Sequence, residues 1–181
     1  MELDKNIKRK YLLEQYNPEW VEQFEVIKKR VEDVFGEKAL SIEHVGSTSI
    51  HGMFAKPLID VLVSVENIEN LQGETGGMES LGYLHGRDYI EPRSLLFFKM
   101  TDEEQKLENI HVCEKGSAKT KQFLIMRDFF RAFPDKAKEY SDLKRKNFEE
   151  FPDDYPAYRA AKTPFLQKAE QEAYEWNSSL T

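Results

Sequence analysis

Cysteine is almost absent from this sequence, since Cys113 is the only one among 181 residues. A single cysteine excludes a disulfide within the chain and any metal site built from several cysteines. Long apolar segments are also absent: the longest lies around residues 58–63, far below the roughly 20 residues that span a bilayer. The first 16 residues carry charges without a continuous apolar stretch, so we expect no secretory signal. These absences predict a protein of the reducing cytoplasm with no membrane partner.

Acidic residues outnumber basic residues overall, but positive charge is locally concentrated. The formal net charge is −7, yet residues 114–168 contain 13 Lys and Arg against 9 Asp and Glu. An acidic chain is a poor candidate for extended nucleic-acid binding, because a basic face supplies most of that affinity. A local basic cluster instead favours a small anionic ligand.

The hydrophobic periodicity predicts an α/β front followed by a helical tail. Asn17-Pro18-Glu19 is typical of a helix start, and apolar residues follow at helical spacing as far as Gly36. Strands are expected at 39–45, 58–63, 83–84, 94–100 and 109–113, with a helix broken by glycines over 67–81. Tail helices are expected from 117, from 134 to 152, and from 153 to 176 with a kink at Pro164. We expect residues 1–16 to be a weakly ordered lead-in, with an edge strand between 11 and 16. We also expect one domain over 1–181, made of a core (1–115) and a helical segment (116–181).

A Gly-Ser-Thr-Ser turn, residues 46–49, follows the first expected strand. Gly46 can adopt a positive φ or let a phosphate approach the backbone. Ser47 and Thr48 add hydroxyl donors, and the amides of a short helix starting here would favour an anion. A simple turn with a helix cap is the structural alternative.

Asp60 lies near the start of the second apolar strand. A carboxylate in a buried strand is costly without a partner. If this strand pairs with the first, Asp60 lies beside the turn, where a carboxylate and substrate phosphates commonly hold Mg²⁺ together. A cap, or a buried ion pair with Lys56 or an arginine, is the structural alternative.

Several ordered motifs resemble one family. The segment IEHVGSTSIHGMFAKPLIDVLV closely resembles the signature of the GrpB family, whose members look like nucleotidyltransferase-fold proteins. The similarity continues in NIHVC, FLIMRDFFRAFPDKAKEYSDLKRK and FPDDYPAYRAAKTPF, and so covers the chain from Tyr16 to about Gln167. The resemblance implies an α/β (α+β) fold: a nucleotidyltransferase-like mixed sheet with flanking helices and a C-terminal helical segment. In that superfamily, acids on the second strand hold divalent metal for in-line transfer of a nucleotidyl group.

The acid pattern departs from that superfamily. A second acid is expected two positions after Asp60, on the same side of the strand, and this chain has Leu62 there. A third acid often comes from a later strand, where this chain offers His111. Glu43 and His44 alternate along the first strand, so only one of them easily faces the site. One metal held by Asp60 with help from His111 or Glu43 is one interpretation, ligand binding without transfer is another, and a core role for His111 remains open.

The candidate site residues form two groups. Asp60, His111 and Glu43 are the candidate catalytic residues, with Asp60 as the Mg²⁺ ligand. The candidate ligand-binding residues are the turn and nearby bases: Gly46, Ser47, Thr48, Lys56, Arg127 and Arg131. Arg127 and Arg131 share a helix face, and arginine can grip a phosphate with two parallel bonds, although a solvated helix face is the alternative.

Three functions are compatible with these residues. The first is Mg²⁺-dependent nucleotidyl or phosphoryl transfer to a small metabolite. The second is non-catalytic binding of a nucleotide or CoA-like ligand, which the family resemblance also suggests because some members look fused to dephospho-coenzyme A kinase. The third is a protein-interaction domain that has kept only the fold. The expected partner in the first two is a small anionic ligand, a nucleotide above all.

Overall fold

A five-stranded mixed sheet forms the centre of the computed structural model, which describes residues 11–101 and 105–180. The strands are β1 (Ser41–Val45), β2 (Ile59–Val65), β3 (Leu84–Arg87), β4 (Ser94–Met100) and β5 (Lys106–Glu114), in the spatial order β1-β2-β5-β4-β3. Strands β2 and β5 are parallel, and the other neighbouring pairs are antiparallel. The expected mixed α/β sheet is therefore confirmed.

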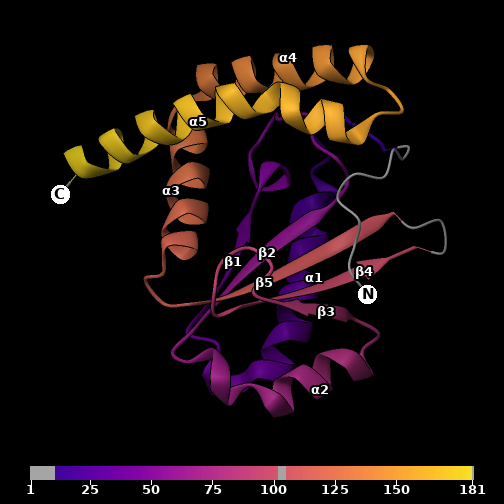
Figure 1. The fold of residues 1–181 in the computed structure, drawn as a ribbon, viewed down its shortest axis with the longest axis vertical. Helices are drawn as coiled ribbons and strands as arrows, with labels where there is room; N and C mark the ends of the chain where they lie inside the picture. Colours follow the sequence, from indigo (N-terminus) through magenta and orange to yellow (C-terminus); the bar gives the residue numbers. More distant parts are fainter. Residues whose placement is uncertain (1–10, 102–104, 181) are drawn as a thin grey trace.

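Helices cover both faces of this sheet (Figure 1). Helix α1 (Glu19–Phe35) lies behind it, and α2 (Gln72–Ser80) lies beyond the β3 edge. Helix α3 (Ala118–Ala132) covers the opposite face, while α4 (Pro134–Glu150) and α5 (Tyr155–Ser179) cross one end of the molecule. The expected flanking helices and helical tail are thus confirmed, and α5 continues through Pro164 as one helix.

The two faces of β2 have different roles because strand side chains alternate. Ile59, Val61 and Val63 pack into the main core, where α1 contributes its buried apolar stripe. Leu62 points to the other face and packs with Val45 against α3. Asp60 shares that second face, so the sheet directs its carboxylate toward the C-terminal helices.

The predicted break of the helix at its glycines is wrong. A 3₁₀ turn, η3 (Ile68–Asn70), is separated from α2 by Leu71 alone, and α2 then runs without interruption through Gly73, Gly76 and Gly77. A Cβ added to Gly77 would lie 2.8 Å from Val34 Cγ1 on α1. The missing side chain therefore lets α1 and α2 approach closely, and tertiary packing overrides the poor helix propensity of glycine.

The segment before α1 is tied to the rest of the fold. Tyr11 is buried, and its hydroxyl donates to the Phe151 carbonyl at 2.6 Å. The expected edge strand is reduced to an isolated antiparallel bridge between Glu14 and Ala55. The remainder of the expected lead-in, residues 1–10, lies outside the described residues. In the described part of the chain, no helix combines the length and apolarity needed to cross a membrane.

Candidate functional site

Gly46 sets the shape of the turn that follows β1. Its φ of 72° and ψ of −175° lie in a region that is essentially restricted to glycine. A Cβ at this position would also lie 2.6 Å from Asp60 Oδ2. Glycine therefore allows the turn to lie directly against the carboxylate. The expected helix start is a single 3₁₀ turn, η2 (Ser47–Ser49).

Hydrogen bonds and ring stacking by His44 and Thr48 hold this turn in place. The His44 ring stacks on Phe24, and its Nε2 lies 3.0 Å from Thr48 Oγ1. Because the Thr48 hydroxyl donates its one hydrogen to the Leu58 carbonyl, His44 Nε2 must carry the proton that Thr48 accepts. Burial lowers the pKa of His44 to about 4, so the ring is neutral near pH 7 and acts as a structural support.

Asp60 is held by two side chains from β5. The parallel register pairs Asp60 with Asn109 and Leu62 with His111. Asp60 Oδ1 accepts from Asn109 Nδ2 at 2.9 Å and lies 3.2 Å from His111 Nε2. Burial raises the pKa of Asp60, but the bonds from His111 and Asn109 and the charge of Lys56 outweigh it and hold the pKa below its usual range. The carboxylate is therefore ionised, with Oδ1 engaged and Oδ2 facing the turn.

Two buried polar atoms beside Asp60 have no hydrogen-bond partner within the described residues. They are Asn109 Oδ1 and His111 Nδ1. The His111 ring also contacts the Phe123 ring on α3, with centroids 4.8 Å apart. Buried polar atoms are normally paired, so this end of the cluster has capacity for a further hydrogen-bonding partner.

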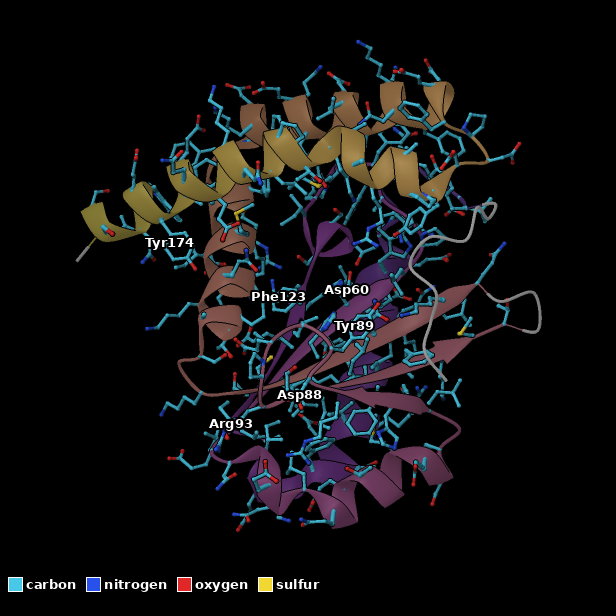
Figure 2. All side chains as sticks on the ribbon, viewed as in Figure 1. Asp60, Asp88, Tyr89, Arg93, Phe123 and Tyr174 are labelled. Atoms are coloured by element: carbon cyan, nitrogen blue, oxygen red, sulfur yellow. The ribbon has the colours of Figure 1, made fainter. Side chains whose placement is uncertain are left out.

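A cavity of about 290 Å³ lies beside Asp60, between the turn, the sheet and α5; we call it the basic cavity. Figure 2 shows Asp60 on β2 with Tyr89, another lining residue, close to it. Asp60 supplies the one carboxylate among the described residues that line it. The cationic side chains that line it are Lys56, Lys106, Lys144, Arg159 and Lys162. The walls therefore carry a clear excess of positive charge.

Lys144 is the most buried of these cations, at 2% exposure. Its Nζ donates to Ser47 Oγ at 3.1 Å and lies 4.5 Å from the centre of the Tyr140 ring. Burial, followed by the charge of Lys162, lowers the pKa of Lys144 well below its usual value. Lys144 therefore joins α4 to the Gly-Ser turn across 97 residues of sequence.

Lys162 and Lys56 form the α5 side of the cavity. Burial lowers the pKa of Lys162 to about 8, and the charges of Lys56 and Arg159 contribute to that decrease. Lys56 Nζ donates to Tyr155 Oη at 2.6 Å. Burial raises the pKa of Tyr155, but the charges of Lys56, Lys162 and Arg159 outweigh it and lower the pKa. The cationic side chains on this side of the cavity thus create a strongly positive environment.

The structure brings together some of the predicted site residues. Ser47, Thr48, Lys56, Asp60 and His111 line the basic cavity. Gly46 adjoins them through its contact with Asp60.

The two predicted arginines and Glu43 lie on the other side of the turn. Arg127 forms ion pairs with Glu43 and with Asp128, both at 2.8 Å. Arg131 donates from Nη2 to the Ser49 carbonyl at 3.0 Å. These contacts hold α3 against β1 and the turn, and the roles of the three residues toward a ligand stay predictions.

Sequence reasoning missed most of the α5 side of the cavity. Tyr155, Tyr158, Arg159 and Lys162 follow at spacings of three, one and three, which places them on one helix face. This spacing is the feature of the sequence that could have identified these residues as one surface. Asn109 and Lys144 also belong to the site; Lys144 falls within the basic cluster expected over residues 114–168, but no local pattern singles out either residue.

The metal-donor set around Asp60 is small. Across residues 11–101 and 105–180, no group of three or more His, Cys, Asp or Glu side chains could hold a metal ion. Leu62, two positions after Asp60 on the same face of β2, is fully buried. Asp60 therefore fits a Mg²⁺ ion only where ligand phosphates and water supply most of the coordination.

Comparisons with known proteins show what the chain is similar to. A family model described as GrpB protein matches residues 10–172. UPF0157 protein YqkA of Bacillus subtilis is 34% identical over 93% of this chain, and the chain spans about half of that relative's length, at 49%. Dephospho-CoA kinase of Mycolicibacterium paratuberculosis is 24% identical over 90% of the chain and 46% of its own length. The crystal structure of conserved protein GrpB from Enterococcus faecalis has a TM-score of 0.86 at 29% identity, covering 92% of this chain and 99% of that one. This chain therefore belongs to the GrpB family.

Proposed function

We propose that this protein binds a small polyanion, a nucleotide or a CoA-like molecule, with its phosphates in the basic cavity. The observation that carries the proposal is the set of five cationic side chains around Asp60, the one carboxylate among the lining residues that the structure describes. Lys144 and Lys162 have no carboxylate ion pair among the described residues. Buried charge without a counterion is costly, and a bound polyanion would supply that counterion.

The neighbouring groups suit the rest of such a ligand. Ser47 Oγ can accept from Lys144 and donate to a phosphate oxygen. Tyr155 lines the α5 side of the basic cavity and is partly exposed, so it offers aromatic surface on which a base can stack. At about 290 Å³ the basic cavity holds phosphates, and the remainder of a nucleotide would extend beyond it. Similarity to a protein named dephospho-CoA kinase supports a nucleotide- or CoA-like ligand.

Mg²⁺-dependent nucleotidyl or phosphoryl transfer to a small metabolite is the second candidate. The position of Asp60 Oδ2 favours it, because that oxygen is turned toward the Gly-Ser turn while Oδ1 is held by Asn109 and His111. Asp60 would hold the metal, and a bound Mg²⁺ would neutralise and orient phosphate oxygens. Lys144 and Lys162 would supply positive charge where a second metal is missing. A nucleotidyltransferase-like ancestry is part of this proposal.

Calorimetric titration with ATP, CoA and tripolyphosphate, each with and without Mg²⁺, tests both candidates. Lys162→Met removes one charge-assisted contact of about 1.5–3 kcal/mol and should weaken binding by roughly 10- to 100-fold. Lys168→Met is the matched control, because Lys168 lies on the same helix with its side chain 75% exposed. If none of the three anions binds the wild type, or if both variants bind equally well, the basic cavity is not the anion site.

Asp60→Asn separates the two candidates. Binding without transfer predicts equal or tighter affinity, because the variant removes the one negative charge from the described cavity lining. Transfer predicts that Mg²⁺ strengthens ATP binding in the wild type and that Asp60→Asn abolishes this difference. An affinity that ignores Mg²⁺ in both proteins would eliminate the transfer candidate in its Mg²⁺-dependent form.

A further inference from the structure

A second cavity, of about 520 Å³, lies between α3, α5 and the loop after the Gly-Ser turn; we call it the apolar cavity. Its volume falls within the roughly 300–1,000 Å³ typical of small-molecule sites. Its lining is dominated by apolar side chains from three segments: Ile50, Met53, Phe123, Met126, Phe130 and Leu166. Figure 2 shows one of them, Phe123 on α3, beside Asp60 on β2.

The apolar and basic cavities adjoin at three shared lining residues, Ser47, Asp60 and Lys162. The carboxylate of Asp60 thus borders a polar space on one side and an apolar space on the other. Two molecules bound in the two cavities would meet at this residue.

Two charged side chains of the apolar cavity, Arg127 and Glu170, are already engaged, and the other two, Asp60 and Lys162, lie at the end shared with the basic cavity. Arg127 is engaged by Glu43 and Asp128. Glu170 accepts from the side-chain amide of Gln122. The interior therefore offers little to a charged ligand body, whereas Asp60 Oδ2 offers a strong acceptor at the end shared with the basic cavity. A ligand group that contacts Oδ2 must donate a hydrogen, which selects a hydroxyl or an amine.

We propose that the apolar cavity binds the apolar body of a small alcohol or amine, with its hydroxyl or ammonium group hydrogen-bonded to Asp60. Taken with the proposed function, on which this pairing rests, the alcohol or amine is the metabolite that lies next to the phosphates of the bound polyanion. The apolar site itself follows from its own lining and is testable without any anion present.

The uncharged dye N-phenyl-1-naphthylamine is the first probe, because its fluorescence rises in apolar surroundings. We expect saturable binding of one dye per chain and at least a tenfold loss of affinity in Met126→Trp, which fills the cavity. Val26→Trp is the matched control, since Val26 is 62% exposed on α1. Circular dichroism checks folding, and Leu166→Trp serves as the second filling variant if Met126→Trp does not fold.

Crossed titrations distinguish this proposal from the basic-cavity proposal. Lys144 lines only the basic cavity of the two, so Lys144→Met should lose tripolyphosphate binding and keep dye binding. Met126→Trp should do the reverse. Dye binding that is absent in the wild type, or unchanged in both filling variants, overturns the apolar site whatever tripolyphosphate does.

Competition tests the end of the site at Asp60. Cyclohexylamine and cyclohexanol should displace the dye at least tenfold more effectively than cyclohexanecarboxylate, because the Asp60 charge repels a second carboxylate. Asp60→Asn should reduce that preference for the amine. Equal displacement by all three compounds would show that the ligand does not point its polar group at Asp60.

Discussion

Replacing Gly46 by alanine tests the contact between the turn and Asp60. The backbone conformation alone should cost about 1–3 kcal/mol for a residue other than glycine. The new methyl group would lie 2.6 Å from Asp60 Oδ2 and 3.1 Å from Asp60 Cβ. The carboxylate must then shift from the position in which it is hydrogen-bonded to Asn109 and His111, which distorts hydrogen bonds to a charged group worth about 1.5–3 kcal/mol each. We expect Gly46→Ala to lower the free energy of unfolding by about 3–5 kcal/mol.

Urea unfolding provides the measurement, and Gly52→Ala provides the control. Gly52 has a φ of 76° and no atom within 4 Å of an added Cβ, so its substitution should cost only the backbone strain of about 1–2 kcal/mol. In a double-mutant cycle, Asp60→Ala should recover about 1 kcal/mol of the Gly46→Ala loss, because the 2.6 Å contact disappears. Equal losses at positions 46 and 52, with no coupling to Asp60, would refute the close approach of turn and carboxylate.

Three further predictions concern protonation and packing. ATP affinity should fall as the pH rises from 7 to 9, because Lys162, with its pKa lowered to about 8 by burial, loses its charge while the phosphates stay ionised. Calorimetry should find that the affinity of Lys162→Met depends less steeply on pH. Identical pH profiles for the variant and the wild type would contradict this prediction. Burial lowers the pKa of His44 from 6.5 to about 4, so the unfolded chain binds a proton between these values and the folded chain does not. Stability should therefore fall with decreasing pH in that window by up to about 1.4 kcal/mol per pH unit, and urea titrations of His44→Phe should show a shallower slope than the wild type. Gly76→Ala should raise the free energy of unfolding by about 0.8–1 kcal/mol, because alanine is a better helix former than glycine. Gly77→Ala should raise it by less, or lower it, because the added Cβ would contact Val34. Equal increases in the two variants would argue against the close packing of α1 and α2.

The sequence predicts the sheet and its principal helices well because those elements carry simple periodicities. The α1 stripe of Trp20, Phe24, Ile27 and Val31 is buried as its spacing indicates. The expected pairing of the first two strands places Val45 opposite Asp60, which brings the turn to the carboxylate. The part of the candidate site formed by the turn and Asp60 can therefore be predicted from the pairing of neighbouring strands.

The remainder of the site depends on long-range packing, which local patterns do not encode. Arg127 and Arg131 have the spacing of an anion clamp, but Glu43 and the Ser49 carbonyl engage them. Lys144 looks like one of many tail lysines, and buried lysines are rare enough that no sequence rule favours one. The glycines of α2 predict a helix break because their low helix propensity can be recognised in the sequence, whereas the packing of Gly77 against Val34 cannot.

The parallel pairing of β2 with β5 has a consequence for the order in which the protein can fold. It joins residues 59–65 to residues 108–114, so the centre of the sheet requires a contact between segments separated by about fifty positions. Such non-local pairing slows folding, because loop-closure entropy is lost before the contact is gained. During synthesis the sheet cannot be completed until β5 has emerged from the ribosome, and the lysine and tyrosine wall of the basic cavity arrives only with α5. The proposed polyanion binding therefore requires α5, and polyanion affinity in nascent or truncated chains would report the docking of that helix.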